Sequence, residues 1–114
     1  MIIATMPHSV SVTIPSTKNV NEAFDNSSIV LNIMHEMSEA FGGCTMTKAY
    51  GAYVADNGAL ITEEVNVISA FVSEEQFFCA YTTMQGIAQL VCRVMTQECV
   101  LFTVDNVAFL VDGK

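Results

Sequence analysis

The sequence predicts a two-layer α+β fold in which two helices cover one face of an antiparallel sheet. Apolar residues alternate with a period of two in five short segments and recur every three or four residues in two longer ones. Turn-forming residues separate these segments. The length of 114 residues predicts a single domain, residues 1–114, with a core that needs no metal or disulfide.

The first strand is predicted at residues 8–14. Val10, Val12 and Ile14 alternate there with serine and threonine, which is typical of a strand with one polar face. Pro15 ends this strand, because proline lacks the amide that a sheet interior needs. The segment before it, residues 1–7, is predicted to be loose.

The first helix is predicted to follow a polar loop over residues 15–27. An apolar stripe runs from Ile29 to Phe41 at helical spacing, and Ser27 or Ser28 is the expected N-cap. The glycines at 42 and 43 are expected to end the helix, since glycine readily adopts the left-handed conformation found there.

A β-hairpin is predicted next, with strands over residues 44–54 and 60–72. Asp56-Asn57-Gly58 lies between them, and Asn-Gly favours a type I′ turn. The alternation of the second strand is uneven, which predicts a β-bulge near Glu63-Glu64. Because neighbouring strand residues point to opposite faces, these two carboxylates are not expected to share a site.

The last third of the chain predicts a helix and a second hairpin. Ser73 and Gln76 form a capping-box pattern, and the apolar stripe that follows ends near Thr96. Strands are expected over residues 99–104 and 107–111, joined by a turn at Asp105-Asn106.

This order of elements matches a ferredoxin-like βαββαβ arrangement with an extra C-terminal edge strand. The face of the sheet opposite the helices is expected to carry several apolar residues, and such a patch usually marks an interface. We therefore expect a homodimer that forms through the sheet, unless residues 1–7 cover these side chains. The predicted interface residues are Ile68, Ala70, Leu101 and Leu110.

The charge balance restricts the partners. Twelve acidic residues face four basic ones, and the net charge of −8 argues against binding nucleic acid through phosphate contacts or binding an anionic membrane surface. It predicts instead a protein partner with a basic surface. The acidic residues expected to contact that partner are Glu22, Asp25, Glu36, Glu39, Asp56, Glu63, Glu64, Glu74 and Glu75.

No catalytic constellation, cofactor motif or metal-ligand spacing stands out, so no catalytic residues, no cofactor and no metal are predicted, and an enzyme is not the favoured interpretation. The four scattered cysteines predict reduced, mostly buried thiols. No signal peptide or long apolar run is visible, so a cytoplasmic protein is expected. An alternative is a dimer that binds a small molecule between sheet and helices, as a ligand sponge or an isomerase-like enzyme, with Tyr50, Tyr53 and Glu64 at the pocket.

The runs Ile14 to Asn21 and Phe41 to Thr45, with Gly51 and Glu63-Glu64-Val65, resemble small phage- and plasmid-borne proteins of ferredoxin-like type. This resemblance implies an accessory protein of a mobile element, acting in the host cytoplasm if a phage encodes it. Such proteins often inhibit host defence systems. The leading hypothesis is accordingly a non-enzymatic, anti-CRISPR-like inhibitor that covers a basic surface of its target.

Overall fold

The computed structural model describes residues 1–18 and 22–114. For residue 22 it describes the backbone alone. Its elements, in chain order, are β1 (His8–Pro15), β2 (Thr17–Lys18), β3 (Glu22–Ala23), α1 (Ser27–Phe41), β4 (Thr45–Val54), β5 (Leu60–Val72), α2 (Glu74–Phe77), α3 (Ala80–Val94), β6 (Val100–Val104) and β7 (Val107–Val111).

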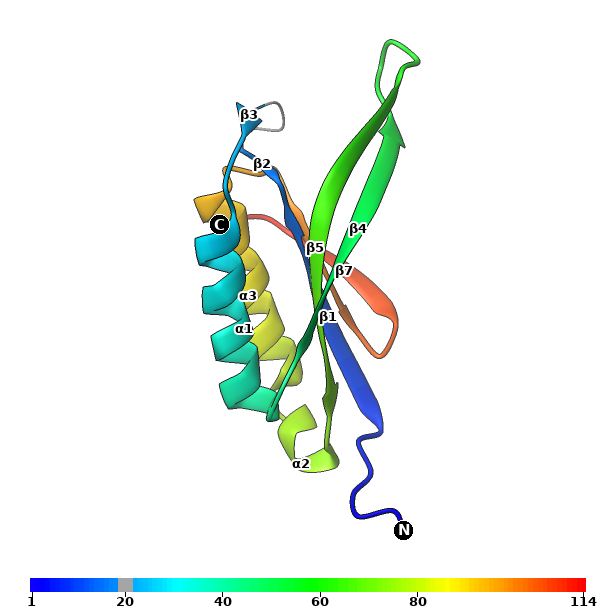
Figure 1. Ribbon diagram of the computed structural model, residues 1–114, viewed down its shortest axis with the longest axis vertical. Coiled ribbons are helices and arrows are strands. Elements are labelled where there is room, and N and C mark those ends of the chain that lie inside the picture. Colours follow the sequence, from blue (N-terminus) through cyan, green and yellow to red (C-terminus); the bar gives the residue numbers. More distant parts are fainter. Residues whose placement is uncertain (19–21) are drawn as a thin grey trace.

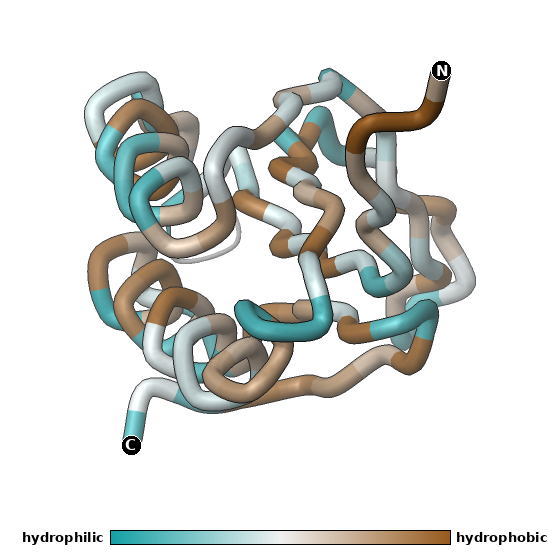
Figure 2. Tube along the Cα trace, turned by 90° about the horizontal axis from the view of Figure 1, so that it is seen from below, coloured by the Kyte–Doolittle hydropathy of each residue, from teal (hydrophilic) through white to brown (hydrophobic). Residues whose placement is uncertain are grey.

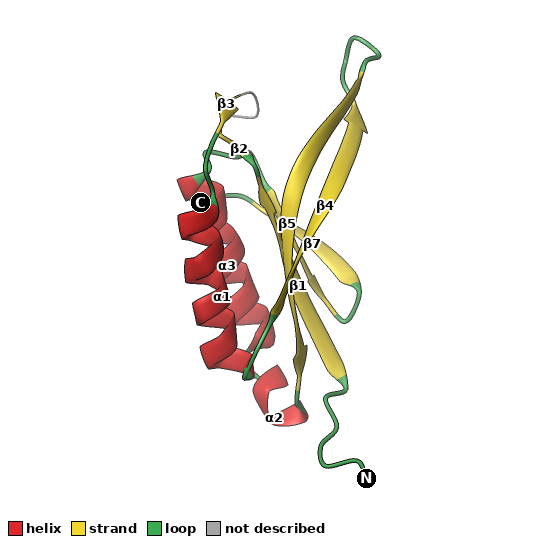
Figure 3. Ribbon diagram, in the orientation of Figure 1, coloured by secondary structure: helices red, strands yellow, loops and turns green. Residues whose placement is uncertain are grey.

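Five strands form one antiparallel sheet in the order β4-β5-β1-β6-β7. Helices α1 and α3 lie side by side on one face of it, which confirms the predicted α+β class and the added edge strand β7 (Figures 1 and 3). The β4–β5 hairpin continues past the helices, and the molecule is accordingly 53 Å long and 24 Å across. The short α2 and the N-terminal segment lie at the opposite end (Figure 1).

The core fills the space between the helices and the sheet. Val10, Val12 and Ile14 of β1 face the helices, as their alternation predicts, and are at most 1% exposed. The helices contribute apolar stripes that include Ile33 and Met84, both fully buried. Seen end-on, the helix pair lies on one side of the strands, and the apolar N-terminal segment lies on the other (Figure 2).

The faces of β5 differ from the prediction. The pairing of β5 with β4 runs without interruption from Thr45↔Ser69 to Val54↔Leu60, so the predicted bulge is absent. Ile68 and Ala70 therefore pair with Val12 and Val10 of β1. Since paired residues share a face, both side chains turn toward the helices, where they are 0% and 7% exposed.

The expected placement of Ile68 and Ala70 on the open face is thus wrong, because the face that a strand residue occupies depends on the register, and this register sets both beside the buried residues of β1. Leu101 and Leu110 pair with each other, and they lie on the open face as expected. Leu110 is 67% exposed. A role for these residues in a dimer interface stays a prediction.

The turns and helix ends show further differences. The type I′ conformation occurs at Asp105 and Asn106, whose φ angles are 51° and 65°, and not at Asn57, which lacks a positive φ. Asn26, rather than Ser27 or Ser28, is the N-cap of α1, and its side chain does not cap the helix. Gly42 ends α1 with a φ of 88°, as predicted.

The helix predicted between Ser73 and about Thr96 is divided into α2 and α3 at Phe78-Cys79. The capping box is confirmed: the Gln76 amide donates to Ser73 Oγ over 3.2 Å, and the Ser73 amide donates to Gln76 Oε1 over 3.0 Å. Cys79 and Cys99 are exposed, so the expectation of mostly buried thiols is wrong, although all four cysteines are free.

Candidate functional site

A cleft of about 380 Å³ opens between the start of α1 and the helix-facing side of the β4–β5 hairpin. It combines charged, amide and apolar side chains, as small-molecule sites usually do. Residues that line this cleft include Asp25, Asn26, Met34, Met46, Lys48, Glu64 and Asn66.

The register of the hairpin brings the polar residues of the cleft together. Lys48 pairs with Asn66, and Tyr50 pairs with Glu64, so Lys48, Glu64 and Asn66 share one face. Lys48 Nζ lies 3.6 Å from Glu64 Oε1. The side chains of Lys48 and Glu64 are 71% and 45% exposed, so both charges remain accessible to a ligand.

Helix α1 supplies the opposite wall. Val30 and Met34 stand one turn apart on it, and they make that wall apolar together with Leu31. Asn26, just before the helix, is held in place because its Nδ2 donates to Pro15 O over 2.7 Å and its Oδ1 accepts from Asn66 over 3.3 Å. These hydrogen bonds therefore hold the side-chain amides of Asn26 and Asn66 in place without a ligand.

The two adjacent carboxylates of β5 point to opposite faces, as expected. Glu63 lies away from the cleft, and its Oε1 accepts from the Ser16 amide over 3.1 Å and from Thr17 Oγ over 3.0 Å. Glu63 thereby ties the end of β1 to the hairpin. Of these two carboxylates, Glu64 faces the cleft, which Asp25 also lines.

The predicted pocket residues are only partly brought together. Tyr50 is the cross-strand neighbour of Glu64 and is 79% exposed. Tyr53 pairs with Ile61 on the other face of the hairpin. Lys48, Asn26 and Asn66 were missed, because single polar residues at these positions carry no periodic or spacing signal.

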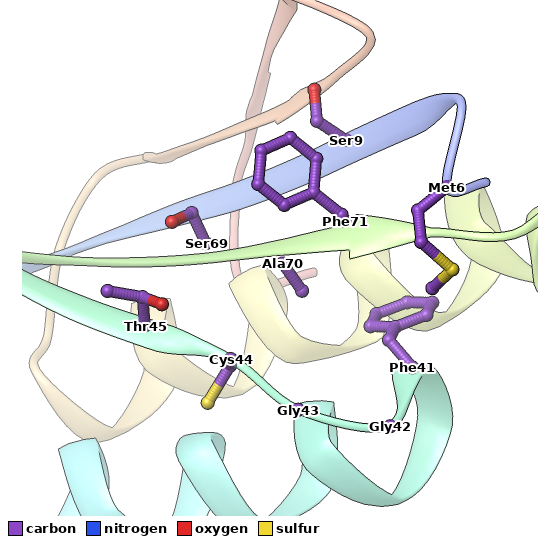
Figure 4. A pocket seen from close by; sticks show the side chains of 10 residues that line it. All are labelled: Met6, Ser9, Phe41, Gly42, Gly43, Cys44, Thr45, Ser69, Ala70 and Phe71. Atoms are coloured by element: carbon purple, nitrogen blue, oxygen red, sulfur yellow. The ribbon is translucent and has the colours of Figure 1, made fainter. Parts of the chain in front are cut away.

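A second groove, of about 280 Å³, lies at the other end of the sheet, where α1 ends and β4 begins. Met6, Phe41 and Phe71 surround it, together with the Gly42-Gly43 backbone and the serines of neighbouring strands (Figure 4). None of the described residues that line it carries a charge. The described part of this groove therefore offers a ligand no charged side chain, whereas the first cleft offers Lys48 and Glu64.

The predicted acidic surface is not one continuous patch. Glu36 and Glu39 lie on α1, Asp56 lies at the hairpin tip, and Glu74 and Glu75 lie on α2 at the far end. Asp25 accepts hydrogen bonds from the Ser27 hydroxyl and amide, which lower the pKa of its carboxyl. The side chain of Glu22 is outside the described part.

Among the described residues, no group of three or more histidine, cysteine, aspartate or glutamate side chains is placed to hold a metal ion. None of the described helices is long and apolar enough to cross a membrane.

No protein-family model and no curated protein matches the sequence. Among solved structures, the chain is similar to a phage SAM lyase in complex with S-methyl-5′-thioadenosine, with a TM-score of 0.71 and 12% identity over 98% of this chain and 96% of that one. The apo state of phage SAM lyase gives a TM-score of 0.69 and 13% identity over the same shares, 98% and 96%.

The chain is also similar to CutA from Synechococcus elongatus PCC7942, with a TM-score of 0.53 and 15% identity over 94% of this chain and 83% of that one. At these identities the likeness establishes the fold. The leading functional hypothesis is also overturned: a structural neighbour that matches 98% of this chain is a lyase, so the prediction of a non-enzymatic, anti-CRISPR-like inhibitor is wrong.

Proposed function

We propose that this protein is a lyase that binds S-adenosylmethionine in the cleft at Glu64 and releases S-methyl-5′-thioadenosine. The observation that carries the proposal is the structural likeness to a phage SAM lyase over 98% of this chain and 96% of that one. A phage origin, which the sequence resemblance implied, is part of the same proposal.

The side chains of the cleft complement the groups of this substrate. Glu64 and Lys48 offer the charges that match the ammonium and carboxylate groups of an amino acid. Asn26 and Asn66 offer amide groups to the hydroxyls and base edges of a nucleoside. The apolar wall around Met34 fits the flat adenine ring and the methyl group on sulfur.

The reaction breaks the bond between the sulfonium sulfur and the amino-acid chain. Both bonding electrons go to sulfur, so the cation becomes the neutral thioether of S-methyl-5′-thioadenosine. Attack by the substrate's own carboxylate on the carbon that loses sulfur closes a lactone, and this balances the reaction without a co-reactant. Because positive charge on sulfur disappears, an apolar wall beside the sulfur favours the transition state over the bound substrate.

In this scheme Glu64 binds the ammonium group, which stays charged throughout, and orients the chain for ring closure. Lys48 engages the substrate carboxylate as it enters. In this scheme the cleft positions the substrate, and its two carboxylates, Asp25 and Glu64, act as fixed charges rather than as an acid or a base.

The test is to incubate the purified chain with S-adenosylmethionine and to quantify S-methyl-5′-thioadenosine by liquid chromatography with mass spectrometry. Loss of one charge-assisted contact corresponds to about 10- to 100-fold in rate, so Glu64→Gln is expected to lower kcat/KM by that factor. Glu75→Gln is the matched control, because it removes an equal charge from exposed α2, outside the cleft.

If the wild-type chain forms no S-methyl-5′-thioadenosine, the proposed activity is wrong. If the wild type is active and Glu64→Gln matches Glu75→Gln, the activity stands and the assignment of the cleft is wrong. A lactone as the second product supports ring closure, whereas an unsaturated amino acid would contradict it.

We also propose that the chain self-associates through the open face of its sheet. Leu101 and Leu110 pair there, and the serine and threonine side chains of β1 beside them are uncharged. Sedimentation equilibrium tests this, with Leu110→Lys expected to reduce the mass to that of one chain. Leu60→Lys is the control, because Leu60 is also 67% exposed but lies at the far hairpin tip. Dissociation by the control alone would place the contact on the hairpin instead.

A further inference from the structure

His8 joins three segments at the end of the sheet that lies away from the hairpin. Its Nδ1 lies 2.7 Å from Asp105 Oδ2 in the β6–β7 turn, and its Nε2 lies 3.2 Å from Glu74 Oε1 on α2. The side chain is only 18% exposed. The imidazole thus stands between two carboxylates contributed by different elements.

The partners of His8 are held in place independently of it. Asp105 Oδ1 accepts from the Ser9 amide over 3.0 Å, and the Asp105 amide donates to Ser9 O over 2.8 Å. The backbone of α2 is fixed by its capping box. Phe77 of α2 stacks on the imidazole with ring centroids 3.6 Å apart and an angle of 9° between the planes.

The protonation state of His8 decides whether both contacts are favourable. A protonated imidazole donates from Nδ1 to Asp105, and its charge attracts Glu74, which lies within 3.2 Å of Nε2 although the two atoms do not form a hydrogen bond in this arrangement. A neutral imidazole donates from one nitrogen only, so the other presents a lone pair to a carboxylate. Asp105 is bound to the β1 backbone, whereas the Glu74 side chain is 76% exposed, so the contact with Glu74 is the one that is lost.

We propose that His8 is a protonation-dependent latch that holds α2 against the end of the sheet. The charged groups that face the imidazole are Asp105 from the β6–β7 turn and Glu74 from α2. Its strand partner on β5, Val72, is uncharged. The hydrogen bond to Asp105 raises the pKa of His8 most; burial opposes this, and Glu74 adds to the increase. The latch is therefore closed at acidic pH and opens as the pH rises past this raised pKa.

The latch bears on the second groove, because the chain on both sides of His8 lines this groove and α2 lies next to its Gly42 wall. Met6 and Ser9 lie on either side of His8 in sequence and line the groove, where Met6 approaches Phe41 (Figure 4). Gln76 of α2 lies beside Gly42, where a Cβ on the glycine would be 3.9 Å from Gln76 Nε2. Opening of the latch is therefore expected to change the surroundings of Met6.

The experiment is an NMR titration of the full chain between pH 5 and 9, roughly the range over which histidine changes charge. We expect the His8 ring to titrate above the ordinary value of about 6.5. The amide signals of Gln76 and Phe77 and the methyl signal of Met6 are expected to move with the same midpoint. Met46, which is 37% exposed against 38% for Met6, lies in the other cleft and is the control methyl group.

Two pairs of variants distinguish the latch from a general effect of pH. His8→Gln is expected to abolish the pH-dependent shifts of Gln76 and Met6, whereas His35→Gln should leave them unchanged, because His35 is 74% exposed on α1. Glu74→Gln is expected to lower the His8 midpoint toward 6.5, and Glu75→Gln should not. A His8 midpoint at or below 6.5, or α2 signals that do not follow it, would overturn the proposal.

Discussion

Replacing Ile68 with alanine tests the arrangement of the sheet directly. Ile68 is 0% exposed and lies between Val12 of β1 and Met46 of β4 in the register. The substitution removes buried methyl and methylene groups and leaves a cavity beneath the helices. Substitutions of this kind reduce the free energy of unfolding by about 2–5 kcal/mol, and a fully buried site between two strands has little freedom to collapse.

Leu110→Ala is the matched control on the opposite face. Leu110 is 67% exposed in the single chain, so at protein concentrations too low for self-association its truncation is expected to change the free energy of unfolding by less than about 0.5 kcal/mol. Urea unfolding followed by circular dichroism, at one fixed protein concentration, measures both variants. With an m-value of about 2 kcal/mol per molar urea, Ile68→Ala should lower the unfolding midpoint by about 1–2.5 M.

The reverse order would refute the arrangement of faces. If Ile68→Ala were neutral while Leu110→Ala cost more than about 2 kcal/mol, Ile68 would not be in the helix-facing core. A loss of stability in Leu110→Ala that disappears on dilution would instead come from self-association, because only that contribution depends on concentration.

Three further predictions concern local features. Ser73→Ala removes the capping box of α2 and should cost about 1 kcal/mol in urea unfolding; no loss would mean that the cap adds nothing to stability. Gly42→Ala places a side chain at a φ of 88° and should cost about 1–3 kcal/mol by the same assay, whereas an unchanged midpoint would contradict this strain. The pKa of His8 is raised, so the stability that His8 adds to the fold is complete below about pH 6.5 and is lost as the pH rises through the folded-state pKa. The pKa of Asp105 is lowered by His8 and Ser9, so the stability that Asp105 adds is present above about pH 4 and is lost as the pH falls through the folded-state pKa. Unfolding midpoints measured from pH 6 to 8 should therefore decline in the wild type more than in His8→Gln, and equal slopes would contradict the prediction.

Local patterns were sufficient for most of the elements. The alternation around Val12 identified β1, and the pattern of Ser73 and Gln76 identified the capping box. The strand predicted at residues 60–72 has the observed bounds. These features depend on residues within a few positions of one another, so their signal is present in the sequence itself.

The division of the second predicted helix at Phe78-Cys79 had no such signal, since the apolar stripe continues across it. The two turns also show the limit of local rules. Asn57-Gly58 has the favoured sequence for a type I′ turn, yet Asp105-Asn106 adopts this conformation. The reason is that the residues next to Asp105-Asn106, Val104 and Val107, pair with each other and leave only these two residues to form the turn.

For this protein, the sequence by itself determined the fold class, the five strands of the main sheet and helix α1, although the short β2 and β3 lie in the predicted loop at residues 15–27. Only the tertiary structure decided that Ile68 faces the helices, that Lys48 and Asn66 stand beside Glu64, and that His8 meets Asp105 and Glu74. The reason is physical. Strand and helix periodicity comes from interactions between near neighbours, whereas these contacts depend on the register between segments that are distant in the chain.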